Sequence, residues 1–89
     1  MSARLQRLRE RLMALAPLEL EVSDESHLHV GHAGARDGRG HFRVRIVAAT
    51  FCGERPLARH RRVYAALGDL MQTDIHALAI EALSPEESP

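Results

Sequence analysis

The chain has 89 residues, with 12 basic and 12 acidic side chains, no formal net charge and one cysteine. This length predicts a single domain over residues 1–89, and the balanced charge argues against a dedicated nucleic-acid binder. One cysteine excludes an internal disulfide, and no stretch approaches the ~20 apolar residues of a membrane span, so we expect a cytoplasmic protein.

The first 22 residues predict a helix followed by a strand. Between residues 3 and 16, leucines recur at three- and four-residue steps, which is typical of an amphipathic helix (Leu5, Leu8, Leu12 and Leu15). Pro17 is expected to end this helix. Residues 18–22 then alternate apolar and acidic side chains, which indicates a strand with one buried face.

A histidine-rich segment, residues 25–41, separates this strand from a second one at residues 42–46. It holds four of the six histidines (His27, His29, His32 and His41). A connection of this length without secondary structure is often functional or disordered, so we predict a mobile loop. Glutamates of the first strand face arginines of the second if the two pair in antiparallel fashion (Glu19, Glu21, Arg43 and Arg45).

The second half of the chain predicts a helix, a strand and a short tail. Pro56 fits the first turn of a helix over residues 57–71. Its apolar stripe comprises Leu57, Val63, Tyr64, Leu67, Leu70 and Met71. Residues 76–83 predict a third strand, and residues 84–89 form a short C-terminal tail that opens with the pattern of a capping box.

The order α-β-β-α-β predicts an α+β fold with a three-stranded mixed sheet. The first two strands pair antiparallel, and the last two are parallel because a helix joins them. Since parallel neighbours begin at the same edge of a sheet, the histidine loop and His76 are expected at one end of the molecule. Cys52 is expected at the other end, about 20–25 Å away for a strand of seven residues.

The histidines are candidate metal ligands, because neutral imidazole is the commonest metal-binding side chain. A closed zinc site usually has four ligands including cysteines, and the loop has none. A half-site fits better, in which one loop imidazole and His76 offer two nitrogens and a partner supplies the rest. The alternative is a flexible, solvated loop whose histidines bind nothing.

Two further features have a structural and a functional interpretation. The arginines around residues 59–62 either contact phosphates or form the solvated face of an amphipathic helix. Cys52 lacks a second cysteine, so we expect a small, at least partly buried apolar side chain rather than a redox centre. No catalytic triad, phosphate loop or carboxylate pair is present in the sequence, so we expect no enzyme activity.

Three blocks of the sequence together resemble the BolA family: His41-Phe42, the run Phe51-x-Gly53 to Arg59-His60-Arg61-x-Val63-Tyr64, and Ile75-His76-Ala77-Leu78. The resemblance covers nearly the whole chain. It implies a fold related to class II KH domains. It also implies a non-enzymatic partner of a monothiol glutaredoxin, sharing a [2Fe–2S] cluster with a glutathione-bound glutaredoxin in iron–sulfur trafficking or iron and redox regulation.

The same resemblance assigns the ligands. His76 matches the family's invariant ligand, and a loop with histidines but no cysteine resembles the histidine type. Counting forward from Asp24 points to His29 as the loop ligand, whereas counting back from His41 points to His32, which we favour because glycines flank it. The isolated chain is expected to be a monomer without a cofactor.

Some BolA proteins are described as DNA-binding transcriptional regulators, which implies an alternative function. The second helix and the turn before it then supply the phosphate contacts (Arg55, Arg59, Arg61 and Arg62).

Overall fold

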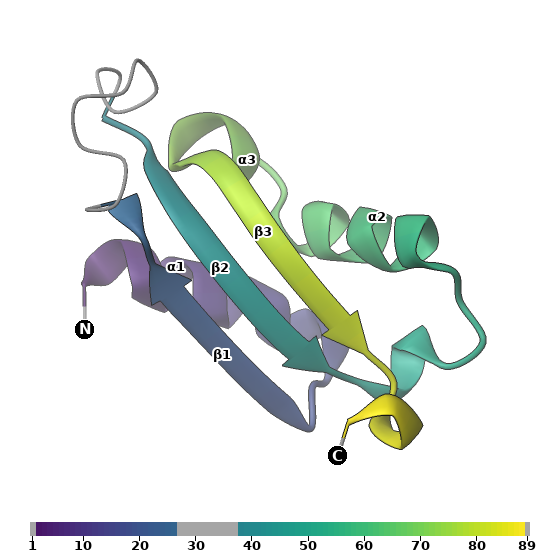
Figure 1. Ribbon diagram of the computed structural model, residues 1–89. Helices are drawn as coiled ribbons and strands as arrows, with labels where there is room; N and C mark the ends of the chain where they lie inside the picture. Colours follow the sequence, from purple (N-terminus) through teal and green to yellow (C-terminus); the bar gives the residue numbers. More distant parts are fainter. Residues whose placement is uncertain (1, 27–37, 89) are drawn as a thin grey trace.

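The computed structural model describes residues 2–26 and 38–88. A three-stranded sheet of order β1-β2-β3 carries its helices on one face (Figure 1). The helices are α1 (Ala3–Leu12), α2 (Pro56–Leu67) and α3 (Leu70–Thr73), and the strands are β1 (Glu19–Asp24), β2 (Gly40–Val47) and β3 (Ile75–Leu83). Three short 3₁₀ turns complete the described chain: η1 (Met13–Leu15), η4 (Ala49–Phe51) and η5 (Pro85–Glu87).

The α+β fold and its mixed sheet are as predicted. β1 pairs antiparallel with β2, and β2 pairs parallel with β3. The predicted pairing of glutamates with arginines is confirmed for one pair only, since Glu19 lies opposite Val47 and Arg43 lies opposite Ser23. Glu21 lies opposite Arg45, while Arg45 also reaches Glu19 at 3.0 Å.

Residues next to helix α1 in the sequence determine where it begins and where it ends. The Ser2 hydroxyl accepts a hydrogen bond from the Leu5 N–H at 3.1 Å and caps the first turn. The helix tightens into η1 and stops at Ala16, which has a left-handed φ of 51° before Pro17. Leu8 and Leu12 are fully buried against the sheet.

The predicted helix over residues 57–71 is two helices, because Gly68 adopts a φ of 56° and separates α2 from α3. The predicted apolar stripe is also partly wrong. Val63 and Leu67 are buried, whereas Leu57 and Tyr64 are 62% and 41% exposed. The reason is helical geometry: at about 100° per residue, positions 63 and 67 share a row, from which position 64 is turned away.

The core lies between the inner face of the sheet and the helices. Its central members are Leu8, Leu12, Phe42, Val44, Ile46, Phe51, Val63, Leu67 and Ile75. Successive side chains of β2 point to opposite faces of the sheet. Phe42, Val44 and Ile46 therefore point into the core, while Arg43 is exposed on the other face. No helix of the described residues is long and apolar enough to cross a membrane.

Candidate functional site

His76 lies at an irregularity in the sheet. Gly40 pairs with Ile75 and His41 pairs with Ala77, so β3 has one residue more than β2 at this point, and that residue is His76. Such bulges bend a strand and re-aim a side chain. The result is an exposed imidazole at the beginning of β3.

The backbone just before His76 is held by a partly buried ion-pair cluster around the Asp74 carboxylate. Asp74 accepts hydrogen bonds from Arg7 at 2.6 Å and Arg4 at 3.2 Å, both on α1, and from the Thr73 hydroxyl at 2.6 Å. These contacts, led by the one with Arg7, lower the pKa of Asp74 to about 2. The Asp74 carbonyl also accepts from the Gly40 N–H at 2.9 Å, so α1, β2 and the start of β3 are joined at one point.

Two described residues of the predicted loop contact His76. The rings of His41 and His76 lie with their centroids 5.2 Å apart, and the Arg39 guanidinium is 3.4 Å from Nδ1 of His76. Nε2 of His41 is buried, so the exposed imidazole of the pair is that of His76.

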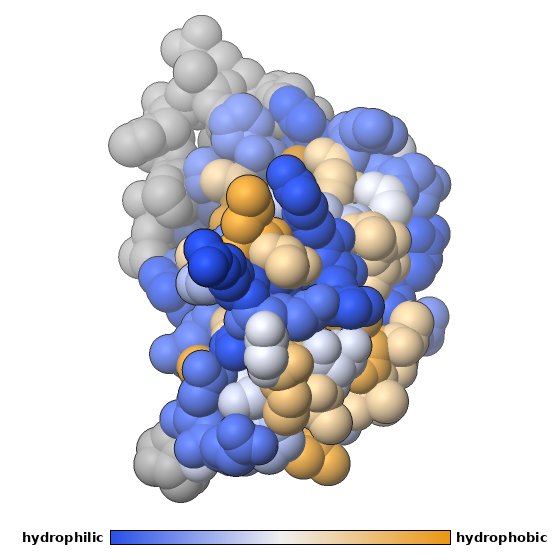
Figure 2. Space-filling view, turned by 90° about the vertical axis from the view of Figure 1, so that its right-hand side faces the viewer, coloured by the Kyte–Doolittle hydropathy of each residue, from blue (hydrophilic) through white to orange (hydrophobic). Residues whose placement is uncertain are grey.

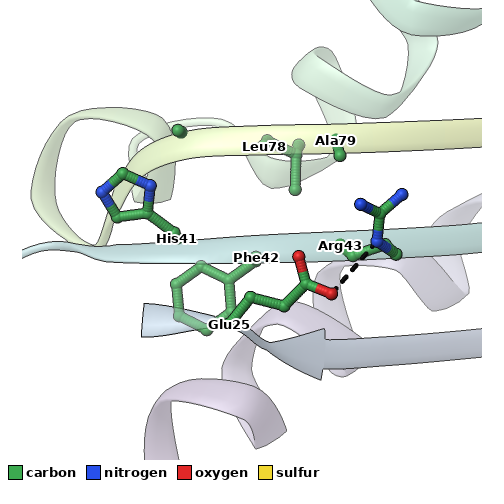
Figure 3. Close-up of a pocket in the computed structure, with 7 residues that line it drawn as sticks. Glu25, His41, Phe42, Arg43, Leu78 and Ala79 are labelled. Atoms are coloured by element: carbon green, nitrogen blue, oxygen red, sulfur yellow. Dashed lines mark hydrogen bonds and ion pairs between the residues drawn. The ribbon is translucent and has the colours of Figure 1, made fainter. Parts of the chain in front are cut away.

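A shallow hollow of about 300 Å³ opens next to this pair, on the face of the sheet that the helices leave uncovered. Figure 3 shows His41 at one end of it and the ion pair of Glu25 with Arg43 at the other. Ala77 and Ala79 line it, and their small side chains leave this space unfilled.

The two ends of the histidine loop converge on this site, as the topology predicts. The Ser26 hydroxyl accepts from the His41 N–H at 3.1 Å, and the His41 carbonyl accepts from the Glu25 N–H at 2.7 Å. β2 begins at Gly40, so His41 belongs to the strand and the prediction that it lies in the loop is wrong. The predicted ligands His29 and His32, together with His27, lie outside the described residues.

The four predicted phosphate contacts are in three different situations. Arg59 is buried, and its guanidinium donates to the Glu54 carbonyl at 2.8 Å, the Ala82 carbonyl at 3.0 Å and the Glu87 carboxylate. Arg62 pairs with the Glu54 carboxylate through two hydrogen bonds. Arg55 and Arg61 are exposed. The four therefore do not form one free basic surface.

Cys52 is exposed, which contradicts the expectation of an at least partly buried side chain. It follows η4 in a turn with Gly53, whose φ is 76°, whereas Phe51 directly before it is buried in the core. Its Sγ lies 3.9 Å from Oε1 of Glu86, beside the C-terminal turn and away from His76, as the topology predicts.

Sequence reasoning missed three residues of the site: Gly40, Asp74 and Arg39. A Cβ on Gly40 would lie 2.8 Å from both the Phe42 ring and the Ser26 hydroxyl, so only glycine fits. The sequence offers one indication of its role, since Gly40 directly precedes the His41-Phe42 block. Asp74 had none, because its arginine partners are 67 and 70 residues away in the sequence.

A family model described as BolA-like protein matches residues 12–87. The chain belongs to the BolA family. It is 43% identical over 97% of its length to Protein BOLA1, chloroplastic, of Arabidopsis thaliana, and spans 56% of that relative, about half its length. It is 41% identical over 92% of its length to the DNA-binding transcriptional regulator BolA of Escherichia coli, and spans 76% of it.

The solved structures agree with the fold. The BolA domain of SufE1 from Arabidopsis thaliana superimposes with a TM-score of 0.85 at 41% identity, covering 98% of each chain. The BolA-named relatives carry the names of regulators or BolA-like proteins, and none of these names is that of an enzyme.

Proposed function

We propose that this BolA-like chain is a non-enzymatic partner of a monothiol glutaredoxin and co-ligates a [2Fe–2S] cluster with it. The observation that carries the proposal is the exposed His76 imidazole at a bulge, at the end of the sheet where the histidine loop begins and ends. Because the imidazole faces solvent, a second protein can bring an iron to it. A role in cluster trafficking or in iron and redox regulation follows from such sharing, and a cytoplasmic location is part of the proposal.

The described residues around His76 fit a nitrogen ligand for a shared cluster. The Asp74 cluster holds the backbone before it, and the His41 ring lies beside it with the two ring centroids 5.2 Å apart. His29 or His32 is proposed as the loop ligand. When bound, the cluster supplies redox chemistry, and histidine ligation of one iron raises the potential of such clusters.

The first experiment is a titration of the protein into a cluster-loaded, glutathione-bound monothiol glutaredoxin, followed by visible circular dichroism. A spectral change that saturates at equimolar ratio and is lost in His76→Ala is expected. His60→Ala is the matched control, because His60 lies on α2 away from this end. His29→Ala and His32→Ala then identify the loop ligand. An unchanged spectrum with the wild-type protein, and no complex in size-exclusion chromatography, would contradict the proposal.

DNA binding is the second candidate, and the name of the Escherichia coli relative favours it. Among the four predicted phosphate contacts, Arg55 and Arg61 are exposed and suited to contact phosphates, whereas Arg59 is buried and hydrogen-bonded to the Ala82 carbonyl. DNA affinity should fall with rising salt and fall further in Arg55→Ala/Arg61→Ala. Arg43→Ala, on the opposite face, is the control, and equal affinity in both variants would remove this candidate.

A further inference from the structure

Strand β3 forms an edge of the sheet. It pairs with β2 on one side, and no other strand of the described chain pairs with it on the other. Proteins usually protect such edges with charges, prolines or covering elements. β3 spans nine residues, and Glu81 is its only acidic or basic residue apart from His76.

The hydrogen bonds show which backbone groups face outward. The Leu83 carbonyl accepts from the Ala48 N–H at 3.0 Å, so residue 83 faces β2, whereas the Ala82 carbonyl accepts from Arg59 on the outer side. Since alternate residues of a strand direct their backbone groups to opposite sides, Leu78 and Ile80 face outward like Ala82. Among the described residues, no hydrogen bond outside the ladder involves Leu78 or Ile80.

The two ends of this edge differ. At the far end the Arg59 guanidinium covers Ala82 and binds Glu87 of η5, which closes the edge. At the near end lies the exposed His76. The open part is therefore the stretch from Leu78 to Ile80, directly beside the candidate ligand. Figure 2 views the molecule from the right-hand side of Figure 1 and shows hydrophobic residues exposed among hydrophilic ones.

We propose that the glutaredoxin adds a short extended segment to this edge, as a fourth strand on Leu78–Ile80; this inference rests on the proposed function. Strand addition uses main-chain hydrogen bonds for affinity and neighbouring side chains for specificity. Leu78 and Ile80 are partly exposed, so the added segment presents apolar side chains. Leu78 is only two residues from His76 on the same strand, so a partner bound at His76 lies next to these backbone groups.

A second copy of this chain fits the edge less well. Antiparallel pairing of two β3 strands about residue 79 would bring residue 76 of one copy opposite Ala82 of the other. The Arg59 guanidinium already occupies that position. The edge therefore suits a segment that ends before Ala82.

The test compares Ile80→Pro with Ile80→Ala. Both substitutions remove the isoleucine side chain, but only proline also removes the backbone N–H. Proline is tolerated where an edge N–H points to solvent, so the ladder with β2 is kept. Affinity for the cluster-loaded monothiol glutaredoxin is measured by calorimetry. Loss of one backbone hydrogen bond predicts about tenfold weaker binding for Ile80→Pro than for Ile80→Ala. Hydrogen exchange of the wild-type Leu78 and Ile80 amides gives a second readout, with protection expected only in the complex.

The outcomes separate the two proposals. Equal affinities of the two variants, or unprotected amides in a complex whose spectrum still depends on His76, would overturn strand addition and leave the shared cluster standing. Absence of any complex with the wild-type protein overturns both. Protection that appears in the protein alone at rising concentration would mean that a second copy occupies the edge, which also overturns the proposal.

Discussion

Replacing Gly40 with alanine tests whether close packing at the start of β2 leaves room only for glycine. The added Cβ would lie 2.8 Å from Cε2 and 2.9 Å from Cζ of Phe42, and 2.8 Å from Oγ of Ser26. Carbon atoms in favourable contact are about 3.5–4.0 Å apart, so the Phe42 ring has to move. That ring is 2% exposed and lies in the core, where movement disturbs its neighbours.

Overpacking of a core costs about 1–3 kcal/mol, and alanine recovers about 0.4–1 kcal/mol by restricting the unfolded chain. The free energy of unfolding should therefore fall by about 1–2 kcal/mol. For a domain of this size that lowers Tm by roughly 5–15 °C, measurable by thermal unfolding followed by circular dichroism.

The partner substitution Phe42→Leu separates steric conflict from other causes. If the ring is the obstacle, Gly40→Ala should cost less in the Phe42→Leu background than in the wild-type protein. An unchanged Tm for Gly40→Ala, or the same loss in both backgrounds, would refute the reasoning.

Two further predictions concern the ion pairs. Because its pKa is lowered to about 2, Asp74 stabilises the fold above its unfolded pKa near 4 and loses this contribution as the pH falls toward 2. Asp74→Asn should reduce the loss of stability between pH 4 and pH 2, measured by urea unfolding; a loss as large as that of the wild-type protein would contradict this. Arg59→Ala should lower Tm clearly more than Arg61→Ala, because it leaves two backbone carbonyls and Glu87 without their donor. Matching Tm values for these two variants would mean that Arg59 does not hold the C-terminal turn.

The C-terminal turn illustrates how sequence and structure divide the explanation. The capping-box pattern at Ser84 predicted a local turn, and the structure has it, with the Ser84 N–H donating to Glu87 at 2.8 Å. The same carboxylate binds Arg59, and these contacts lower the pKa of Glu87 to about 2. Nothing near residue 87 in the sequence indicates an arginine 28 residues away.

By itself, the sequence determined the order of the elements, the mixed sheet and the end of the molecule where His76 lies. Those features depend on hydrophobic periodicity and on chain connectivity, which are readable from neighbouring residues. Only the tertiary structure decided that Arg59 is buried and binds the Ala82 carbonyl, that Asp74 joins α1 to β3, and that His76 lies at a bulge. The physical reason is that ion pairs and strand register depend on which distant segments dock together, and no local pattern records that choice.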